Sequence, residues 1–172
     1  MRILAFDQAS HTTGYSIYED GDLVKYGKFT FDDNDFGVRL NKIRNQVKDM
    51  VCSSMFDKVC FEDIQLQEDV GNNVATFKKL AEVFGVIYEL LTALGIPNEA
   101  ILATVWKNGV GIAGKQRTEQ KKNAQKWVEE KYGFSVTEDE ADAICIGAYA
   151  SGYRAPKIEK VKKSKVEGFD WS

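Results

Sequence analysis

The sequence has one histidine, three cysteines and two prolines among 172 residues, and each scarcity excludes a class of site. Because His11 is the single histidine, zinc sites with two histidines and nucleases built on histidine pairs are excluded. Cys52, Cys60 and Cys145 form no C-x-x-C pair, so we expect small buried residues in a reducing compartment rather than zinc ligands or disulfides. An enzyme of this composition would rely on carboxylates, lysines or hydroxyls.

Long hydrophobic runs are also missing. The longest apolar stretch, residues 143–153, has 11 residues, whereas a membrane helix needs about 18. The first ten residues, MRILAFDQAS, contain too short an apolar run for a signal peptide. With 44% hydrophobic residues the chain can nevertheless build a core, so we expect a cytoplasmic protein without a membrane partner.

Charge is distributed unevenly along the chain. Residues 1–103 carry 10 basic against 16 acidic side chains, and residues 104–172 carry 13 against 10. The basic residues form one cluster over 107–131 and a second over 154–165. A local basic surface can bind nucleic acid even on an acidic chain, but charge alone favours a solvated helix face and a solubilising tail. We predict one domain over residues 1–153 and a mobile basic tail over 154–172.

Hydrophobic periodicity predicts an α/β fold with a five-stranded mixed sheet and helices on its faces. The first three strands should form an antiparallel meander, because Asp20-Gly21 is a hairpin signal. The expected strands are 2–8, 13–19, 23–31, 57–63 and 100–105. The expected helices are 36–55, 74–94 with Asn73 as N-cap, 117–132, and 137–152, and a glycine-rich loop is expected over 106–115.

Four carboxylates stand where acids are costly. Asp7 ends an apolar strand on the same face as Ile3 and Ala5, and Glu62 ends a second strand. Asp139 and Asp142 are three residues apart at the start of the last helix, so both can point at one target. Singly, each acid is explained by a turn or by the helix dipole. If they meet at one edge of a sheet, their mutual repulsion predicts raised pKa values and favours binding of Mg²⁺ or Mn²⁺.

The neighbouring acids have different expected roles. Thr137 and Glu140 fit a capping box, which gives Glu140 a structural task. Glu138 lies close to the face of Asp142 and remains a reserve ligand. Trp106, beside Lys107, is the tryptophan whose position suggests stacking on bases.

Five segments, in order, resemble RuvC-type Holliday-junction resolvases. Asp7-Gln8-Ala9-Ser10 followed by Thr13-Gly14-Tyr15 resembles their opening D-P-G-S-x-x-T-G-Y. The other four segments are residues 59–62 (their second acidic strand), 73–91 (their central helix), 107–117 (their basic loop) and 139–143 (their D-x-A-D-A). Gln8-Ala9 departs from the Pro-Gly of that pattern, and a diverged phage-encoded member is one interpretation.

The resemblance implies a ribonuclease-H-like fold and a homodimeric endonuclease that cuts four-way DNA junctions symmetrically, leaving 5′ phosphates. It implies that Asp7, Glu62, Asp139 and Asp142 hold Mg²⁺ or Mn²⁺, two ions per site, without a small-molecule cofactor. It assigns a catalytic role near the scissile phosphate to Lys107, with Arg117 beside it. The nucleic-acid-binding residues expected from the basic segments are Lys107, Lys115, Arg117 and Lys121.

Three alternatives remain open from the sequence alone. A related nuclease that processes RNA would share the fold and the acids. A sugar kinase or ATPase of the actin-like type also opens with an aspartate and a small-residue hairpin, but needs two such domains. A nucleic-acid-binding module with vestigial acids is the third.

Overall fold

A computed structural model describes residues 1–65 and 74–156 of the chain. Its centre is a five-stranded sheet in the order β3-β2-β1-β4-β5. The strands β1 (Arg2–Asp7), β2 (Thr12–Glu19) and β3 (Asp22–Thr30) form an antiparallel meander. The strands β4 (Lys58–Asp63) and β5 (Asn98–Leu102) run parallel to β1. The predicted mixed α/β sheet is confirmed.

The turn between β2 and β3 has the geometry that its sequence predicts. Asp20 and Gly21 have φ angles of 51° and 94°, which an Asp-Gly pair tolerates. Two successive residues with positive φ match the right-handed twist of the flanking strands, so the meander closes without a longer loop.

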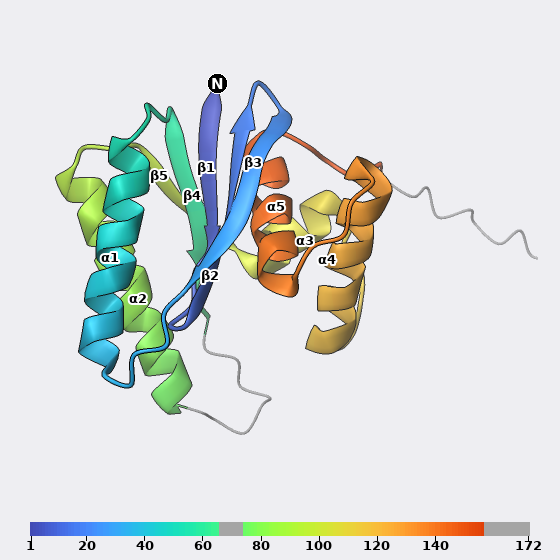
Figure 1. Ribbon diagram of the computed structural model, residues 1–172. Coiled ribbons are helices and arrows are strands. Elements are labelled where there is room, and N and C mark those ends of the chain that lie inside the picture. The colour runs from blue at the N-terminus through green and yellow to red at the C-terminus, as the bar shows by residue number, and fades with distance from the viewer. Residues whose placement is uncertain (66–73, 157–172) are drawn as a thin grey trace, which may run out of the picture.

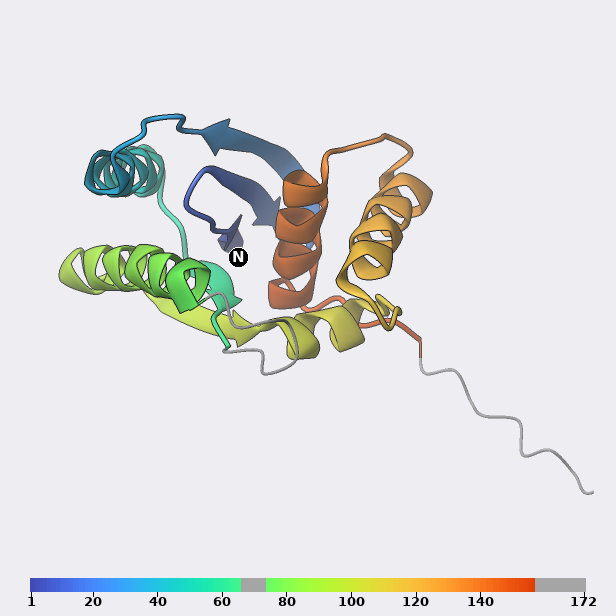
Figure 2. The ribbon, with the colours of Figure 1, turned by 90° about the horizontal axis from the view of Figure 1, so that it is seen from below.

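Helices cover both faces of the sheet (Figure 1). On one face lie α1 (Phe36–Cys52) and α2 (Val74–Ala93). On the other face α5 (Glu138–Ala150) packs directly on β1 and β2, and α3 (Ala103–Val110) and α4 (Arg117–Tyr132) pack against α5. Figure 2 shows the same three layers from below.

Side-chain alternation along the strands divides the core in two. Leu4 and Phe6 of β1 lie in the core beneath α1 and α2, whereas Ile3 and Ala5 lie in the core beneath α5. The next residue on the α5 face of β1 is Asp7, so the fold delivers this acid to the side of the sheet that α5 covers.

Two sequence predictions about the segment after α2 are wrong. The fifth strand lies at Asn98–Leu102 rather than at 100–105, and the first half of the expected loop over 106–115 is the end of helix α3. The glycines there misled the prediction. A Cβ on Gly109 would lie 2.3 Å from the ring of Tyr149, and Gly111, with φ of 85°, ends the helix. One glycine therefore permits close packing, and the other caps α3.

Other expectations have mixed outcomes. Cys60 and Cys145 are buried as expected, but Cys52 is exposed at the end of α1. No helix of the described chain is long and apolar enough to cross a membrane. The expected N-cap Asn73 and the tail from residue 157 lie outside the described residues.

Candidate active site

Asp7 and Glu62 come to the same edge and the same face of the sheet. β1 and β4 are adjacent and parallel, with Ala5 opposite Cys60 and Phe6 opposite Phe61. Ala5 and Cys60 both lie in the core beneath α5, and the acids follow two residues later on each strand. Two carboxylates therefore leave the carboxyl ends of neighbouring strands toward α5.

The first two turns of α5 bring Asp139 and Asp142 to this edge. Gly14 pairs with Asp7 across β1 and β2, and a Cβ on Gly14 would lie 2.0 Å from the carbonyl oxygen of Asp139. Only a glycine permits such a close approach. The Ser16 hydroxyl then donates to the carbonyl of Ala143 at 2.7 Å, which fixes the next turn of the helix on β2.

The start of α5 has the predicted capping arrangement. The Glu140 carboxylate accepts hydrogen bonds from the backbone N–H of Thr137 at 2.9 Å and from its hydroxyl at 2.7 Å. Glu140 is thereby engaged in holding the helix start, as expected. The cap orients the turn that carries Asp139 and Asp142.

The acids affect one another electrostatically. Burial raises the pKa of Asp7 well above its ordinary value, and the charges of Asp142, Glu62 and Asp139 raise it further. Burial raises the pKa of Asp142 to about 6, against the lowering effect of Lys121 and Lys107.

The remaining strand-end acid responds in the same way. Burial also raises the pKa of Glu62, against a hydrogen bond from Trp106 and the charges of Lys107, Arg117 and Lys121. The site thus holds a surplus of negative charge in partly desolvated surroundings.

Basic side chains of α3 and α4 face these acids. Lys121 forms an ion pair with Glu138 at 3.0 Å. Glu138, the additional ligand considered from the sequence, is therefore paired with a lysine in this structure. Burial disfavours the Lys121 charge, but the bond to Glu138 and the charges of Asp142 and Asp7 leave its pKa above the ordinary value. Lys107 donates to the side-chain carbonyl of Gln120 at 3.1 Å.

Lys115 differs from the other predicted basic residues. It lies in the exposed segment between α3 and α4, where its backbone N–H donates to the Glu119 carboxylate at 2.9 Å. The charges that act on the carboxylates are those of Lys107, Arg117 and Lys121.

The donor set suits a hard divalent cation, since it consists of carboxylate oxygens whose charges repel one another. The side chains do not converge on one point: among residues 1–65 and 74–156, no three His, Cys, Asp or Glu residues form a group arranged to hold an ion. One oxygen of Glu62 accepts a hydrogen bond from Trp106, and the other oxygen is left for a further ligand.

Three positions near the acids were missed or misread in the sequence. Trp106 is fully buried in the core beneath α5, so stacking on bases is excluded, and its indole N–H donates to Glu62 Oε2 at 2.9 Å. Gln8 is buried and bonds the backbone of Glu62. Arg39 of α1 is buried and donates to the carbonyl of Ser10 at 3.1 Å, which holds the loop after β1. All three side chains carry polar groups and are nevertheless buried. Hydrophobic periodicity in the sequence does not reveal this burial.

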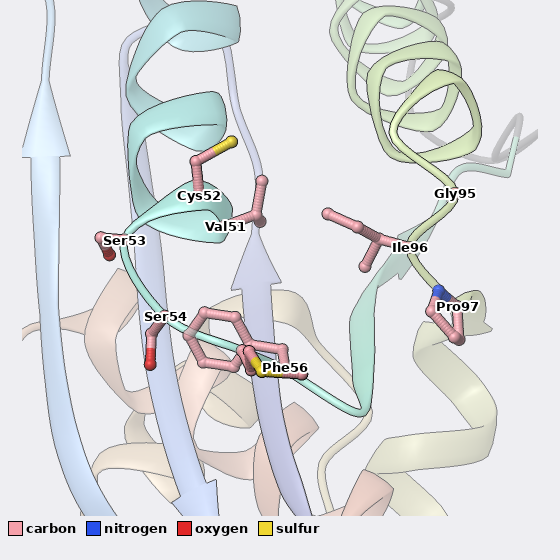
Figure 3. Close-up of a pocket in the computed structure, with 9 residues that line it drawn as sticks. Val51, Cys52, Ser53, Ser54, Phe56, Gly95, Ile96 and Pro97 are labelled. Carbon is pink, nitrogen blue, oxygen red and sulfur yellow. The ribbon is translucent and has the colours of Figure 1, made fainter.

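A separate pocket lies at the opposite edge of the sheet (Figure 3). It has a volume of about 470 Å³ and is lined by the segment that ends α1 and precedes β4, residues 51–56, and by Gly95, Ile96 and Pro97 ahead of β5. These residues precede the parallel strands, whereas the acids follow them. The pocket is therefore not part of the carboxylate site.

Comparisons with known proteins identify relatives in sequence and in fold. No family model matches the chain. The crossover junction endodeoxyribonuclease RuvC of Nitratidesulfovibrio vulgaris is 28% identical over 122 residues, which cover 69% of this chain and 71% of the relative. RuvC of T. thermophilus, solved in complex with a Holliday junction substrate, superposes with a TM-score of 0.69 at 15% identity, over 91% of this chain and 99% of that one.

A viral protein has a similar structure. The Fowlpox virus resolvase, solved with Holliday junction DNA, has a TM-score of 0.51 at 15% identity, over 88% of this chain and 97% of that one. The predicted resemblance to RuvC-type resolvases and the ribonuclease-H-like fold are confirmed.

Proposed function

We propose that this protein is a RuvC-type endonuclease that resolves four-way DNA junctions by metal-dependent hydrolysis of phosphodiester bonds. The observation that carries the proposal is the meeting of Asp7, Glu62 and Asp142 at one sheet edge, faced by Lys107 and Lys121. The same fold belongs to resolvases solved with junction DNA. Sequence similarity to a bacterial RuvC supports action in the bacterial cytoplasm.

The residues that would hold divalent cations are Asp7, Glu62, Asp139 and Asp142. Two bound Mg²⁺ or Mn²⁺ ions would lower the pKa of a bound water and stabilise charge on the departing oxygen. The chain supplies the arrangement: strands fix Asp7 and Glu62, and the capped start of α5 fixes Asp139 and Asp142. The mutual repulsion that helps to raise the pKa of Asp7 and Asp142 would favour binding, because a cation removes this repulsion.

The basic residues would bind the phosphate that the site hydrolyses. The charges of Lys107 and Arg117 lower the pKa of Glu62, and those of Lys107 and Lys121 lower the pKa of Asp142. All three basic residues would therefore be close to a phosphate bound at the acids. Their positive charge would neutralise negative charge that develops on the phosphate. Lys115, on the exposed connection to α4, would contact the DNA backbone at greater distance.

A symmetric dimer would match the symmetry of the substrate. A closed two-fold pair of chains presents two equal sites, and a four-way junction offers two equivalent strands. Paired cleavage of those strands would follow from this arrangement, and 5′ phosphates on the products are what the resemblance to RuvC-type resolvases implies.

A cleavage panel tests the proposal. End-labelled four-way junction, fork, linear duplex, single-stranded DNA and hairpin RNA are incubated with the protein and Mg²⁺, with and without EDTA. We expect symmetric paired nicks in the junction that EDTA abolishes. Cleavage of forks as well would indicate a broader debranching nuclease, whereas cleavage of RNA alone, or no cleavage with either Mg²⁺ or Mn²⁺, would overturn the proposal.

A further inference from the structure

The backbone of Glu62 has no paired residue in β1, because the pairing of β1 with β4 ends one residue earlier. The β1–β4 ladder runs to Phe6 opposite Phe61, whereas the β4–β5 ladder continues to Asp63 opposite Leu102. At Glu62 the peptide groups of β4 that face β1 therefore need other partners, because unpaired backbone groups in a buried sheet are costly.

The side chain of Gln8 provides both partners. Its amide Nε2 donates to the carbonyl of Glu62 at 2.6 Å, and its Oε1 accepts from the Glu62 N–H at 3.2 Å. Gln8 is 6% exposed, so water competes little for these bonds. A primary amide is suited to this task because it carries a donor and an acceptor side by side.

The carboxylate of Glu62 is held independently. Trp106 lies on α3, is fully buried and donates its indole N–H to Glu62 Oε2 at 2.9 Å. This bond engages one carboxylate oxygen and leaves Oε1 for another ligand. Backbone and side chain of Glu62 are thus fixed by residues from two different elements.

We propose that Gln8 and Trp106 are positioning residues that hold Glu62 in the orientation needed to bind a divalent cation. The inference rests on the proposed function, since it assigns residues to the same site. Partners that orient a metal ligand typically change metal affinity or activity about 10- to 100-fold when removed. The motif that this chain resembles has proline at the position of Gln8, and a proline side chain forms no hydrogen bonds. The two hydrogen bonds from Gln8 to the Glu62 backbone therefore distinguish this chain from that motif.

Two variants remove the hydrogen bonds; Gln8→Met nearly keeps the side-chain volume, whereas Trp106→Phe reduces it, as does its control at Trp127. Gln8→Met retains length and shape without donor or acceptor, and Trp106→Phe retains an aromatic ring without the N–H. The matched controls are two variants on the outer helix α4, Gln125→Met and Trp127→Phe. Gln125→Met removes a side-chain hydrogen bond to the carbonyl of Val136, which follows the helix. Each protein is measured for Mn²⁺ affinity by calorimetry, junction affinity, single-turnover cleavage rate and melting temperature.

For Gln8→Met and Trp106→Phe we expect Mn²⁺ affinity and the cleavage rate to fall about tenfold or more, with junction affinity changed less than about twofold. The controls should keep wild-type values for all three. Amide exchange at Glu62, followed by NMR without metal, should accelerate in Gln8→Met and stay unchanged in Gln125→Met.

The outcomes separate the two proposals. Wild-type Mn²⁺ affinity and cleavage in both variants, alongside an active wild-type protein, would overturn the positioning roles and leave the proposed function intact. A wild-type protein that neither binds Mn²⁺ nor cuts junctions would overturn the function, and the positioning roles with it. Losses in Mn²⁺ affinity that merely track a lowered melting temperature, and that the controls share, would also overturn the positioning roles.

Discussion

Gly14 of β2 and Asp139 of α5 are in such close contact that a Cβ at Gly14 would lie 2.0 Å from the Asp139 carbonyl oxygen. Gly14 is also the cross-strand partner of Asp7. A single glycine therefore sets how closely the carboxylates of α5 approach the carboxylate of β1, although it contributes no side chain to the site.

Gly14→Ala should displace the first turn of α5 by about an ångström or more, because carbon and oxygen atoms do not approach to the distance in the present geometry. Displacements of this size typically cost about 100-fold in rate, so we expect a comparable loss of junction cleavage. The free energy of unfolding should fall by about 1–3 kcal/mol, as for other overpacked sites. Cleavage assays and urea denaturation measure both effects.

Gly85→Ala is the matched control, since a Cβ there meets nothing within 4 Å and the residue lies inside α2. The change should leave the protein as stable as wild type or more stable, because alanine favours helix. Equal activity and stability of wild type and Gly14→Ala would show that the α5 contact does not set the site geometry.

The burial of Asp142, to which repulsion from Glu62 and Asp139 adds, should appear in the pH dependence of stability. Asp142 is buried, and its pKa is raised from 3.8 to about 6. Between these pH values the folded state binds more protons than the unfolded state, so the Asp142 contribution to stability is lost as pH rises from about 4 to about 6. Asp142→Asn removes that loss, and at pH 7.5 without metal it should be more stable than wild type by up to about 3 kcal/mol.

Urea denaturation in EDTA at pH 4 and pH 7.5 checks this expectation. The advantage of Asp142→Asn should nearly vanish at pH 4, where both proteins carry a neutral group. Asp49→Asn, at an exposed position of α1, should show no such pH-dependent gain. A variant equally stable to wild type at pH 7.5 would mean that the folded state does not disfavour the charge of Asp142.

Charge at Lys121 should contribute to DNA binding through a phosphate contact. Each lysine–phosphate contact adds about one unit to the slope of log affinity against log salt concentration. Lys121→Gln should therefore weaken junction binding and reduce that slope by about one. Lys48→Gln, on α1 across the sheet, should change neither. An unchanged slope for Lys121→Gln, measured by anisotropy over a salt series, would exclude this contact.

Most of the fold could be predicted from local patterns. The Asp20-Gly21 turn, the alternation in β1 and the capping box of Thr137 and Glu140 each act over a few residues, so the sequence displays them directly. Helix α3 was missed because Gly109 and Gly111 look like loop residues in the sequence. In the structure Gly109 permits close packing against Tyr149, and Gly111 ends the helix.

The site could be predicted in part for the same reason. Acids at strand ends and at a helix start stand out in a sequence, so Asp7, Glu62, Asp139 and Asp142 are recognisable as candidates from the sequence alone. The supporting contacts of Gln8 and Trp106 to Glu62 join residues 54 and 44 positions apart, and Trp106 resembled an exposed base-stacking residue. Long-range hydrogen bonds leave no local periodicity, so these roles emerge only in three dimensions.

The most direct measurement of the central claim is single-turnover cleavage of a saturated four-way junction by wild type and by Asp7→Asn, with Mg²⁺. Asparagine keeps the shape of Asp7 but removes the charge that would hold the cation. We expect a rate lower by about a thousandfold or more, with junction affinity unchanged. Wild-type cleavage by Asp7→Asn would contradict the assignment of this carboxylate cluster as the catalytic centre.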